Sequence, residues 1–186
     1  RTYENIGNKE NALKWYGEAS KYLTTYYGQL AHLKIYPNKE IELDRLMEVD
    51  KDYAEKFYKK DIVKIVHLLD ELNKDKHTKH LLRGLAKDNV SLGSEVLAAK
   101  LASDISRFDF AVQIAKIASY EKRFHNKYNY PVISTPKIIN GRKIPESAFI
   151  LSIIRQESEF DTSAYSRAGA KGLMQLMTYT ARVVAK

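Results

Sequence analysis

Apolar residues recur at helical spacing along the first two thirds of this chain. From Thr2 to about Lys127 they return every three or four residues, in short stretches separated by brief polar or glycine-containing breaks. The chain holds only four prolines and eight glycines in 186 residues, which favours helix. The pattern therefore predicts an all-α fold, in which short helices stack as hairpins and bury their apolar faces on their neighbours.

The breaks give the bounds of the expected helices. Thr24 and Thr25 supply an N-cap for the second helix, and Tyr36-Pro37 ends it. No fixed repeat period is apparent, so we interpret the region as a degenerate helical solenoid. Its many tyrosines are expected to pack mostly between helices, although tyrosine can also stack on sugar rings. The expected helices are Asn11–Tyr22, Tyr26–Ile35, Leu43–Met47, Tyr53–Tyr58, Ile62–Leu72, Lys79–Ala86, Ser94–Ser103 and Phe108–His125.

The texture of the sequence changes at Tyr128. The stretch YNYPVISTPKIINGRKI contains two of the four prolines and an Asn140-Gly141 turn signal. These features predict an extended connector that leads into a new domain. We therefore predict one domain over residues 1–127 and another over residues 128–186.

Three elements are expected in the second domain. Pro145 suits the first turn of a helix that contains the run AFILSII, with Glu146 favourable near its N-terminus. A polar loop, DTSAYSRAGAKG, follows that helix. A further helix is expected from Leu173 to Lys186, in which Leu173 and Leu176 contribute to the core.

The charge of the chain is basic, with a formal net charge of +8. An acidic partner would suit this charge: nucleic acid, anionic lipid or an acidic polymer such as a cell wall. Lysines alternate with Asp and Glu, as in DELNKDKHTKH, so a solvated surface is the plainer interpretation. We expect no nucleic-acid partner, because no known module or basic stripe is apparent. The absence of cysteine excludes disulfides, and His77 and His80 lack a third ligand nearby, so no metal site is expected.

A carboxylate follows the most apolar run, in the stretch AFILSIIRQESEF. Glu157 comes three and four residues after Ile154 and Ile153, so a helix places it near the core-facing stripe, with Arg155 and Glu159 away from it. Two interpretations are open. Backbone N–H groups of the following loop could satisfy the carboxylate, or apolar surroundings could keep it protonated as a general acid.

Two blocks of the second domain carry a family resemblance. The first is Glu157-Ser158-Glu159-Phe160, and the second is SRAGAKGLMQLM over residues 166–177. In this order and spacing they resemble the start of the catalytic domain of soluble lytic murein transglycosylases. Upstream, Tyr130-Pro131 resembles the pair before the family's catalytic helix, and the segment around Trp15-Tyr16 resembles its superhelix. The resemblance implies a helical-hairpin superhelix followed by a truncated lysozyme-like α domain.

The resemblance also implies an activity. The family cleaves the β-1,4 bond between N-acetylmuramic acid and N-acetylglucosamine in peptidoglycan and leaves a 1,6-anhydromuramoyl end. Glu157 matches its single acid/base, Ser158 a position near the substrate, and Met174 and Gln175 a block that lines the sugar cleft. The resemblance further implies a periplasmic location, glycan strands as partner, possible cell-wall protein partners, no cofactor and no metal; it leaves the oligomeric state open.

Two departures and two rivals qualify this expectation. Thr178 stands where the family often has proline, which still permits a helix start. The family motifs expected after Lys186 are not in the sequence, so we expect the chain alone to be a poor enzyme. A water-using muramidase of lysozyme type stays open, with Asp161 as a second carboxylate, although a capping role suits Asp161 better. The other rival is a helical interaction scaffold with a vestigial site.

Overall fold

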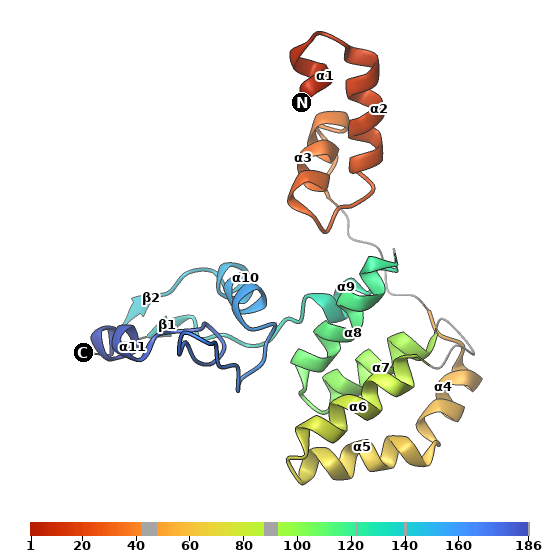
Figure 1. Ribbon diagram of the computed structural model, residues 1–186, viewed down its shortest axis with the longest axis vertical. Helices are drawn as coiled ribbons and strands as arrows, with labels where there is room; N and C mark the ends of the chain where they lie inside the picture. The colour runs from red at the N-terminus through yellow and green to blue at the C-terminus, as the bar shows by residue number, and fades with distance from the viewer. Residues whose placement is uncertain (42–47, 88–92, 122, 140, 186) are drawn as a thin grey trace. The chain divides into compact units, whose positions relative to one another are not determined.

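The computed structural model describes residues 1–41, 48–87, 93–121, 123–139 and 141–185. The chain divides into two compact units, Arg1–Arg45 and Leu46–Lys186 (Figure 1). Among the described residues, one two-stranded hairpin and isolated backbone bridges accompany the helices. This confirms the predicted all-α class. None of the described helices is long and apolar enough to cross a bilayer. The domain boundary predicted between residues 127 and 128 stays a prediction.

The described part of the first unit is formed by α1 (Thr2–Asn5), α2 (Lys9–Ala19) and α3 (Tyr26–Ile35). Helix α3 has the predicted bounds, and Thr25 caps it as expected. The Oγ1 of Thr25 accepts a hydrogen bond from the backbone N–H of Gly28 at 3.0 Å. Position 28 requires glycine, because a Cβ there would lie 1.9 Å from the carbonyl oxygen of Tyr22.

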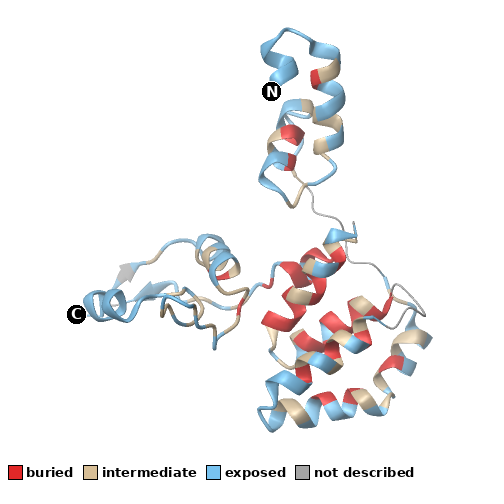
Figure 2. Cartoon of the chain, in the orientation of Figure 1, coloured by how far each residue is buried: buried red, intermediate tan, exposed pale blue. Residues whose placement is uncertain are grey.

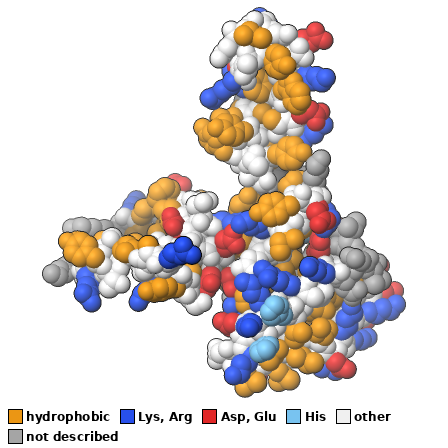
Figure 3. Space-filling view, viewed as in Figure 1, with side chains coloured by type: hydrophobic (Ala, Val, Ile, Leu, Met, Phe, Trp, Pro, Cys, Tyr) orange, Lys and Arg blue, Asp and Glu red, His pale blue; other side chains and the backbone are white. Residues whose placement is uncertain are grey.

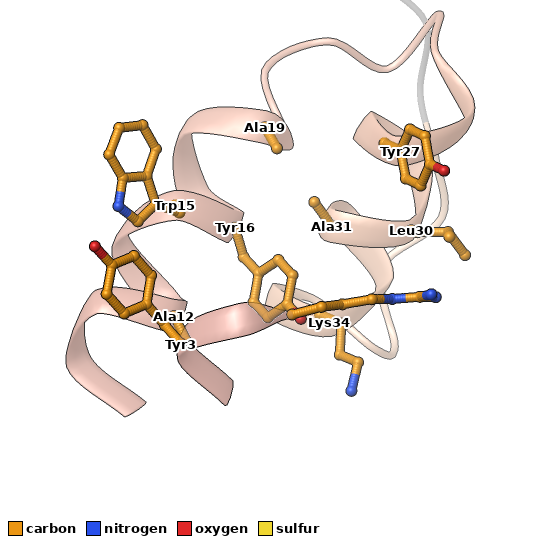
Figure 4. Close-up of a pocket in the computed structure, with 10 residues that line it drawn as sticks. Tyr3, Ala12, Trp15, Tyr16, Ala19, Tyr27, Leu30, Ala31 and Lys34 are labelled. Carbon is orange, nitrogen blue, oxygen red and sulfur yellow. The ribbon is translucent and has the colours of Figure 1, made fainter. Parts of the chain in front are cut away.

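A hollow of about 370 Å³ is lined by residues of these helices (Figure 4). Tyr27 lines it and is 72% exposed, so the expectation that the tyrosines pack between helices is wrong for this residue; Trp15, which also lines the hollow, is 57% exposed. The described helices of this unit are short, and each can cover only one face of a large ring. Glu4 ties them together, because its carboxylate accepts hydrogen bonds from Tyr16 Oη at 2.7 Å and Lys34 Nζ at 2.8 Å.

The second unit has a helical core centred on α7 (Gly93–Asp104). Helices α4 (Lys51–Tyr58), α6 (Asp75–Ala86) and α8 (Phe108–Tyr120) pack against α7, and α5 (Asp61–Glu71) packs against α6. Buried residues concentrate in α7 and α8 (Figure 2). The larger buried side chains of this core are Phe57, Val63, Val66, Leu82, Leu85, Val96, Leu97, Leu101, Phe110, Ile114 and Tyr128.

Two predicted helices of this core have clearly different bounds in the structure. Helix α6 begins at Asp75, four residues before the predicted Lys79, because an acidic residue suits the first turn. Helix α8 ends at Tyr120, and a separate short helix, α9 (Asn126–Asn129), follows. Beyond the end of α8, the side chains of Arg123 and His125 contact Glu95 of α7. The predicted helix over residues 43–47 lies outside the described residues.

The connector after α9 forms the expected turn. Strands β1 (Ile138–Ile139) and β2 (Arg142–Lys143) pair antiparallel, and Gly141 between them has φ of 74°. Helix α10 (Ser147–Glu157) follows, with Glu146 at its N-cap position. The helix thus begins two residues after Pro145 rather than with Pro145 in its first turn.

The last described helix, α11 (Thr178–Val184), is shorter than predicted. The expectation of a helix from Leu173 is wrong, because Gln175 has φ of 47°, which an α-helix excludes. Backbone bridges from Lys171 to Tyr165 and Leu176 fold this stretch into a compact turn instead.

Candidate active site

Helix α10 is anchored by one side only. Ile154 is buried in a small cluster with Val112 of α8 and Phe160. Ile150, one turn earlier on the same face, and Leu173 of the following loop are partly buried against this cluster. The buried face of α10 therefore runs through positions 150 and 154. Through this face the helix packs against α8 of the helical core and against the following loop.

Glu157 does not lie on that face. The side chain is exposed, as is Phe149, which lies two turns earlier on the same side of the helix. The expectation that Glu157 faces the core is therefore wrong: the sequence offers two apolar stripes, and the Ile150–Ile154 stripe is the one that packs. No side-chain hydrogen bond or ion pair joins Glu157 to any described residue. The last residue of α10 thus presents an accessible carboxylate without a side-chain partner in the described part of the chain.

The turn after Glu157 is tightly constrained. The Oγ of Ser158 donates a hydrogen bond to the carbonyl oxygen of Ile154 at 3.1 Å, and its backbone N–H donates to the same atom at 3.1 Å. Glu159 and Phe160 then adopt left-handed φ values of 52° and 68°. Such conformations cost a non-glycine residue roughly 1–2 kcal/mol each, so the surrounding contacts must stabilise this turn.

Two polar contacts connect this turn to the helical core. The Nζ of Lys116, on α8, lies 2.5 Å from Oε1 of Glu159. Arg155 donates from Nε to the carbonyl oxygen of Asn129 at 2.8 Å, and from NH2 to Oδ1 of Asn129 at 2.7 Å. Sequence reasoning missed Lys116 and Asn129, since no local pattern links them to residues some 26 to 43 positions away.

Asp161 has the role of a cap. Its Oδ1 accepts hydrogen bonds from the backbone N–H of Ser163 at 2.8 Å and from Ser163 Oγ at 2.7 Å. This is the geometry of an Asx-turn, and it agrees with the capping interpretation. A residue that holds the loop in this way is poorly placed to act as a second catalytic carboxylate.

The loop from Asp161 to Met177 presents the second predicted block. The Nε2 of Gln175 donates to the carbonyl oxygens of Ala164 at 3.1 Å and Gly172 at 2.9 Å, so its amide nitrogen closes the loop. Met174 is 39% exposed. Leu173 is partly buried as expected, but Leu176 is 44% exposed, because a bridged turn does not place positions 173 and 176 on one helical face.

The surface around these residues is apolar in part. A hollow of about 370 Å³ lies beside α10, lined by Tyr130, Pro131, Leu151, Arg155 and Gln156 among others. Hydrophobic side chains also appear at the surface of the segment that carries α11 (Figure 3). Glu157 is not among the residues that line this hollow, whereas its neighbour Gln156 is. Exposed apolar side chains around a hollow are typical of a surface that binds a partly apolar ligand.

Comparisons with known proteins match this region and the whole chain. Residues 137–186 match the family model of the Transglycosylase SLT domain. A soluble lytic murein transglycosylase of Haemophilus influenzae is 31% identical over 137 residues, which make up 72% of this chain and 22% of that protein. The chain thus spans about a fifth of the length of this relative.

Solved structures of the same kind share the fold. The crystal structure of the 70 kDa soluble lytic transglycosylase SLT70 from Escherichia coli is 21% identical, with a TM-score of 0.71 over 98% of this chain and 29% of that one. A complex of the 70 kDa soluble lytic transglycosylase with bulgecin A (22% identical, TM-score 0.70) covers 97% of this chain and 28% of that one. An inactive glutamate-to-glutamine variant of Slt from Pseudomonas aeruginosa is 21% identical, with a TM-score of 0.67. The match covers 93% of this chain and 28% of that one. By these matches, the chain is similar to soluble lytic murein transglycosylases: residues 137–186 match the SLT domain, and the chain shares the fold of the solved relatives.

Proposed function

We propose that the protein is a peptidoglycan lytic transglycosylase that cleaves the β-1,4 bond between N-acetylmuramic acid and N-acetylglucosamine. The observation that carries the proposal is Glu157. It is an accessible carboxylate without a side-chain partner among the described residues, at the end of an anchored helix. It also lies in the segment that matches the SLT domain.

One carboxylate can perform both proton transfers. Protonated Glu157 donates its proton to the glycosidic oxygen, and the bond from that oxygen to C1 of the muramoyl residue breaks. The substrate's own 2-acetamido group stabilises the cationic C1, as in substrate-assisted glycosidases. The C6 hydroxyl oxygen then attacks C1 and Glu157 takes the hydroxyl proton. The product is a 1,6-anhydromuramoyl end, and no water is consumed.

The exposure of Glu157 leaves room for substrate. In this proposal a glycan strand bound over the end of α10 replaces water around the carboxylate. In this proposal the exposed thioether of Met174 contacts a sugar ring. The amide oxygen of Gln175 accepts from a substrate hydroxyl or amide while its nitrogen closes the loop, and Ser158 lies beside the Glu157 carboxylate.

The relatives support this assignment. One solved relative carries bulgecin A, and another is an inactive variant in which a glutamate is replaced by glutamine. By family, the protein would act in the periplasm on cell-wall glycan, and a net charge of +8 suits a polymer whose peptide stems carry carboxylates. A water-using muramidase is the rival, and the capping bonds of Asp161 argue against it.

Mass spectrometry of released muropeptides tests the proposal. The natural full-length polypeptide that carries this sequence is incubated with isolated sacculi, beside its Glu157→Gln variant. We expect products lighter than hydrolysis products by one water, and loss of these products with the variant. Glu146→Gln is the matched control, because Glu146 lies at the opposite end of α10 and should not affect release.

Other outcomes have definite meanings. Hydrated reducing ends would assign the protein to the muramidases and return Asp161 to consideration. If the wild-type protein released nothing, the enzyme assignment would be wrong, and an interaction scaffold would explain the fold better.

A further inference from the structure

The residues two positions before and after Glu157 are held by side-chain partners, while Glu157 has none among the described residues. Arg155 comes two residues before it and Glu159 two residues after it, and each contacts a different helix of the core. From Glu157, the last helical residue, the backbone passes through Ser158 into two left-handed residues, Glu159 and Phe160. The direction of the Glu157 side chain therefore depends on a turn that would relax if its anchors were removed.

The first anchor comes from α8. Lys116 lies four residues after Val112, so both are on one face of α8. Val112 packs against Phe160, and the Nζ of Lys116 lies 2.5 Å from Oε1 of Glu159. Glu159 and Phe160 are the two strained residues, and each thus has its own partner on α8. The side chain of Glu159 is only 26% exposed, which limits the screening of this ion pair by solvent.

The second anchor comes from α9. The guanidinium of Arg155 donates to both oxygens of Asn129, the backbone carbonyl and the side-chain amide. Its NH1 also lies 3.7 Å from the same oxygen of Glu159 that Lys116 contacts. Arg155 and Lys116 therefore converge on Glu159, and one network connects α8, α9 and the end of α10.

We propose that Lys116 and Glu159 are positioning residues, which hold the turn after α10 so that Glu157 points at the glycosidic oxygen. The hydrogen bonds between Arg155 and Asn129 hold the end of α10 against α9. The proposal rests on the proposed function, because it takes Glu157 as the acid/base. It gives the helical core a direct part in catalysis, since Lys116 and Asn129 belong to the core and not to the SLT match over residues 137–186.

The ammonium of Lys116 is held in its charged form by the contact. The hydrogen bond to Glu159 raises the pKa of Lys116 above its ordinary value of 10.5, so the ammonium stays charged at neutral pH. Misplacement of a reacting group by about 1 Å can cost about 100-fold in rate. A lost anchor should therefore lower kcat, whereas the apolar and polar groups that bind the glycan, and hence KM, should change little.

Two measurements on the natural full-length polypeptide test the proposal, with the variants Lys116→Met, Glu159→Gln and Lys116→Arg. The first is kcat and KM for release from soluble glycan strands. The second is amide hydrogen exchange of the peptide that covers residues 155–161. Lys64→Met is the matched control, because Lys64 of α5 also forms an ion pair, with Asp61 at 2.9 Å, outside this network.

We expect Lys116→Met and Glu159→Gln each to lower kcat about 10- to 100-fold with KM nearly unchanged. Exchange over residues 155–161 should become faster in both, while the thermal unfolding of the core stays the same. Lys116→Arg should restore most of kcat, and Lys64→Met should match wild type.

Each contrary result is informative. Unchanged exchange in both variants would overturn the proposal, because the pair would not hold the turn. Faster exchange with unchanged kcat would also overturn it, because the held geometry would not matter to Glu157. A wild-type protein without activity would refute the proposed function and with it the catalytic role, while faster exchange would still show that Lys116 fixes the turn.

Discussion

Helices α7 and α10 are both apolar, yet they differ in burial. Helix α7 buries eight of its twelve residues, among them Leu97 and Leu101. Helix α10, with the sequence SAFILSIIRQE, is at least as apolar, but Ile154 is its single buried residue. Phe149, in the middle of the apolar run, is 59% exposed.

The difference comes from what surrounds each helix. Helix α7 is packed by α4, α6, α8 and α9, so nearly every face meets another apolar face. Helix α10 meets a cluster that α8 and the following loop supply on one side. An apolar pattern thus identifies segments that can be buried, whereas burial itself depends on coverage by other elements. The uncovered side of α10 is what makes Glu157 accessible.

The largest expected effect on stability comes from replacing a phenylalanine, once in the buried core and once on the exposed side of α10. Phe57 of α4 is fully buried and Phe149 of α10 is not. Phe57→Ala should lower the free energy of unfolding by about 3–5 kcal/mol, through lost burial and a new cavity. Phe149→Ala should change it by less than about 0.5 kcal/mol. Chemical denaturation of both variants checks this, and equal losses would mean that α10 is covered as α7 is.

A smaller effect concerns the one acidic group that α7 carries into the core. Glu95 accepts hydrogen bonds from Arg123 at 2.6 Å and 3.0 Å and lies 3.1 Å from Nε2 of His125. Burial by itself raises the pKa of Glu95, but the bonds from Arg123 and His125 outweigh it and lower the pKa below 4.5. Glu95 thus differs from Glu157, because it is both enclosed and paired.

The sign of the pH dependence follows from that lowered pKa. The contribution of ionised Glu95 to the free energy of unfolding is present above pH 4.5. It is lost as the pH falls through the lower folded-state pKa. Glu95→Gln should therefore cost about 1–3 kcal/mol at pH 7 and progressively less below about pH 4.5. Urea unfolding at several pH values measures this. An equal cost at all pH values would show that the charge of Glu95 does not contribute.

Local signals in the sequence predicted helix α3 and the connector turn well. The bounds of α3 follow from Thr25, whose hydroxyl caps the helix, and from Tyr36-Pro37 at its end. The connector turn follows from Asn140-Gly141, because glycine at position 141 tolerates φ of 74°. These features depend on residues next to each other in the chain, which is why the sequence alone reveals them.

The candidate site was only partly predictable, because its geometry depends on distant residues. The two blocks identified Glu157, Ser158, Met174 and Gln175 as candidates, but not which side of α10 is covered. Coverage is set by Val112 and Phe160, which lie 48 positions apart. The helix predicted from Leu173 failed for a local reason, since a left-handed Gln175 is not a residue type that signals a break.

Substitutions in the loop after α10 should lower stability less than substitutions in the core. Gln175→Ala removes the hydrogen bonds to Ala164 and Gly172, which should cost about 1–2 kcal/mol and remain confined to the loop. Amide exchange over residues 164–177 should become faster, while exchange in α7 stays unchanged. Gln175→Gly is the matched variant: it loses the same bonds but relieves the left-handed φ, so its loss should be smaller. Faster exchange in α7 as well would show that loop and core unfold together.

The smallest expected effect separates the two enzyme classes. Asp161 uses one carboxylate oxygen to accept two hydrogen bonds from Ser163, and an asparagine retains that acceptor. Asp161→Asn should change the free energy of unfolding by only a few tenths of a kcal/mol and leave muropeptide release unchanged. Asp161→Ala should loosen the loop, since both bonds are lost. A second catalytic carboxylate would behave differently: its replacement by asparagine would lower release at least about 100-fold, even though the loop keeps its shape. Because asparagine keeps the cap and removes the charge, this substitution isolates the one property of Asp161 that a muramidase needs and a transglycosylase does not.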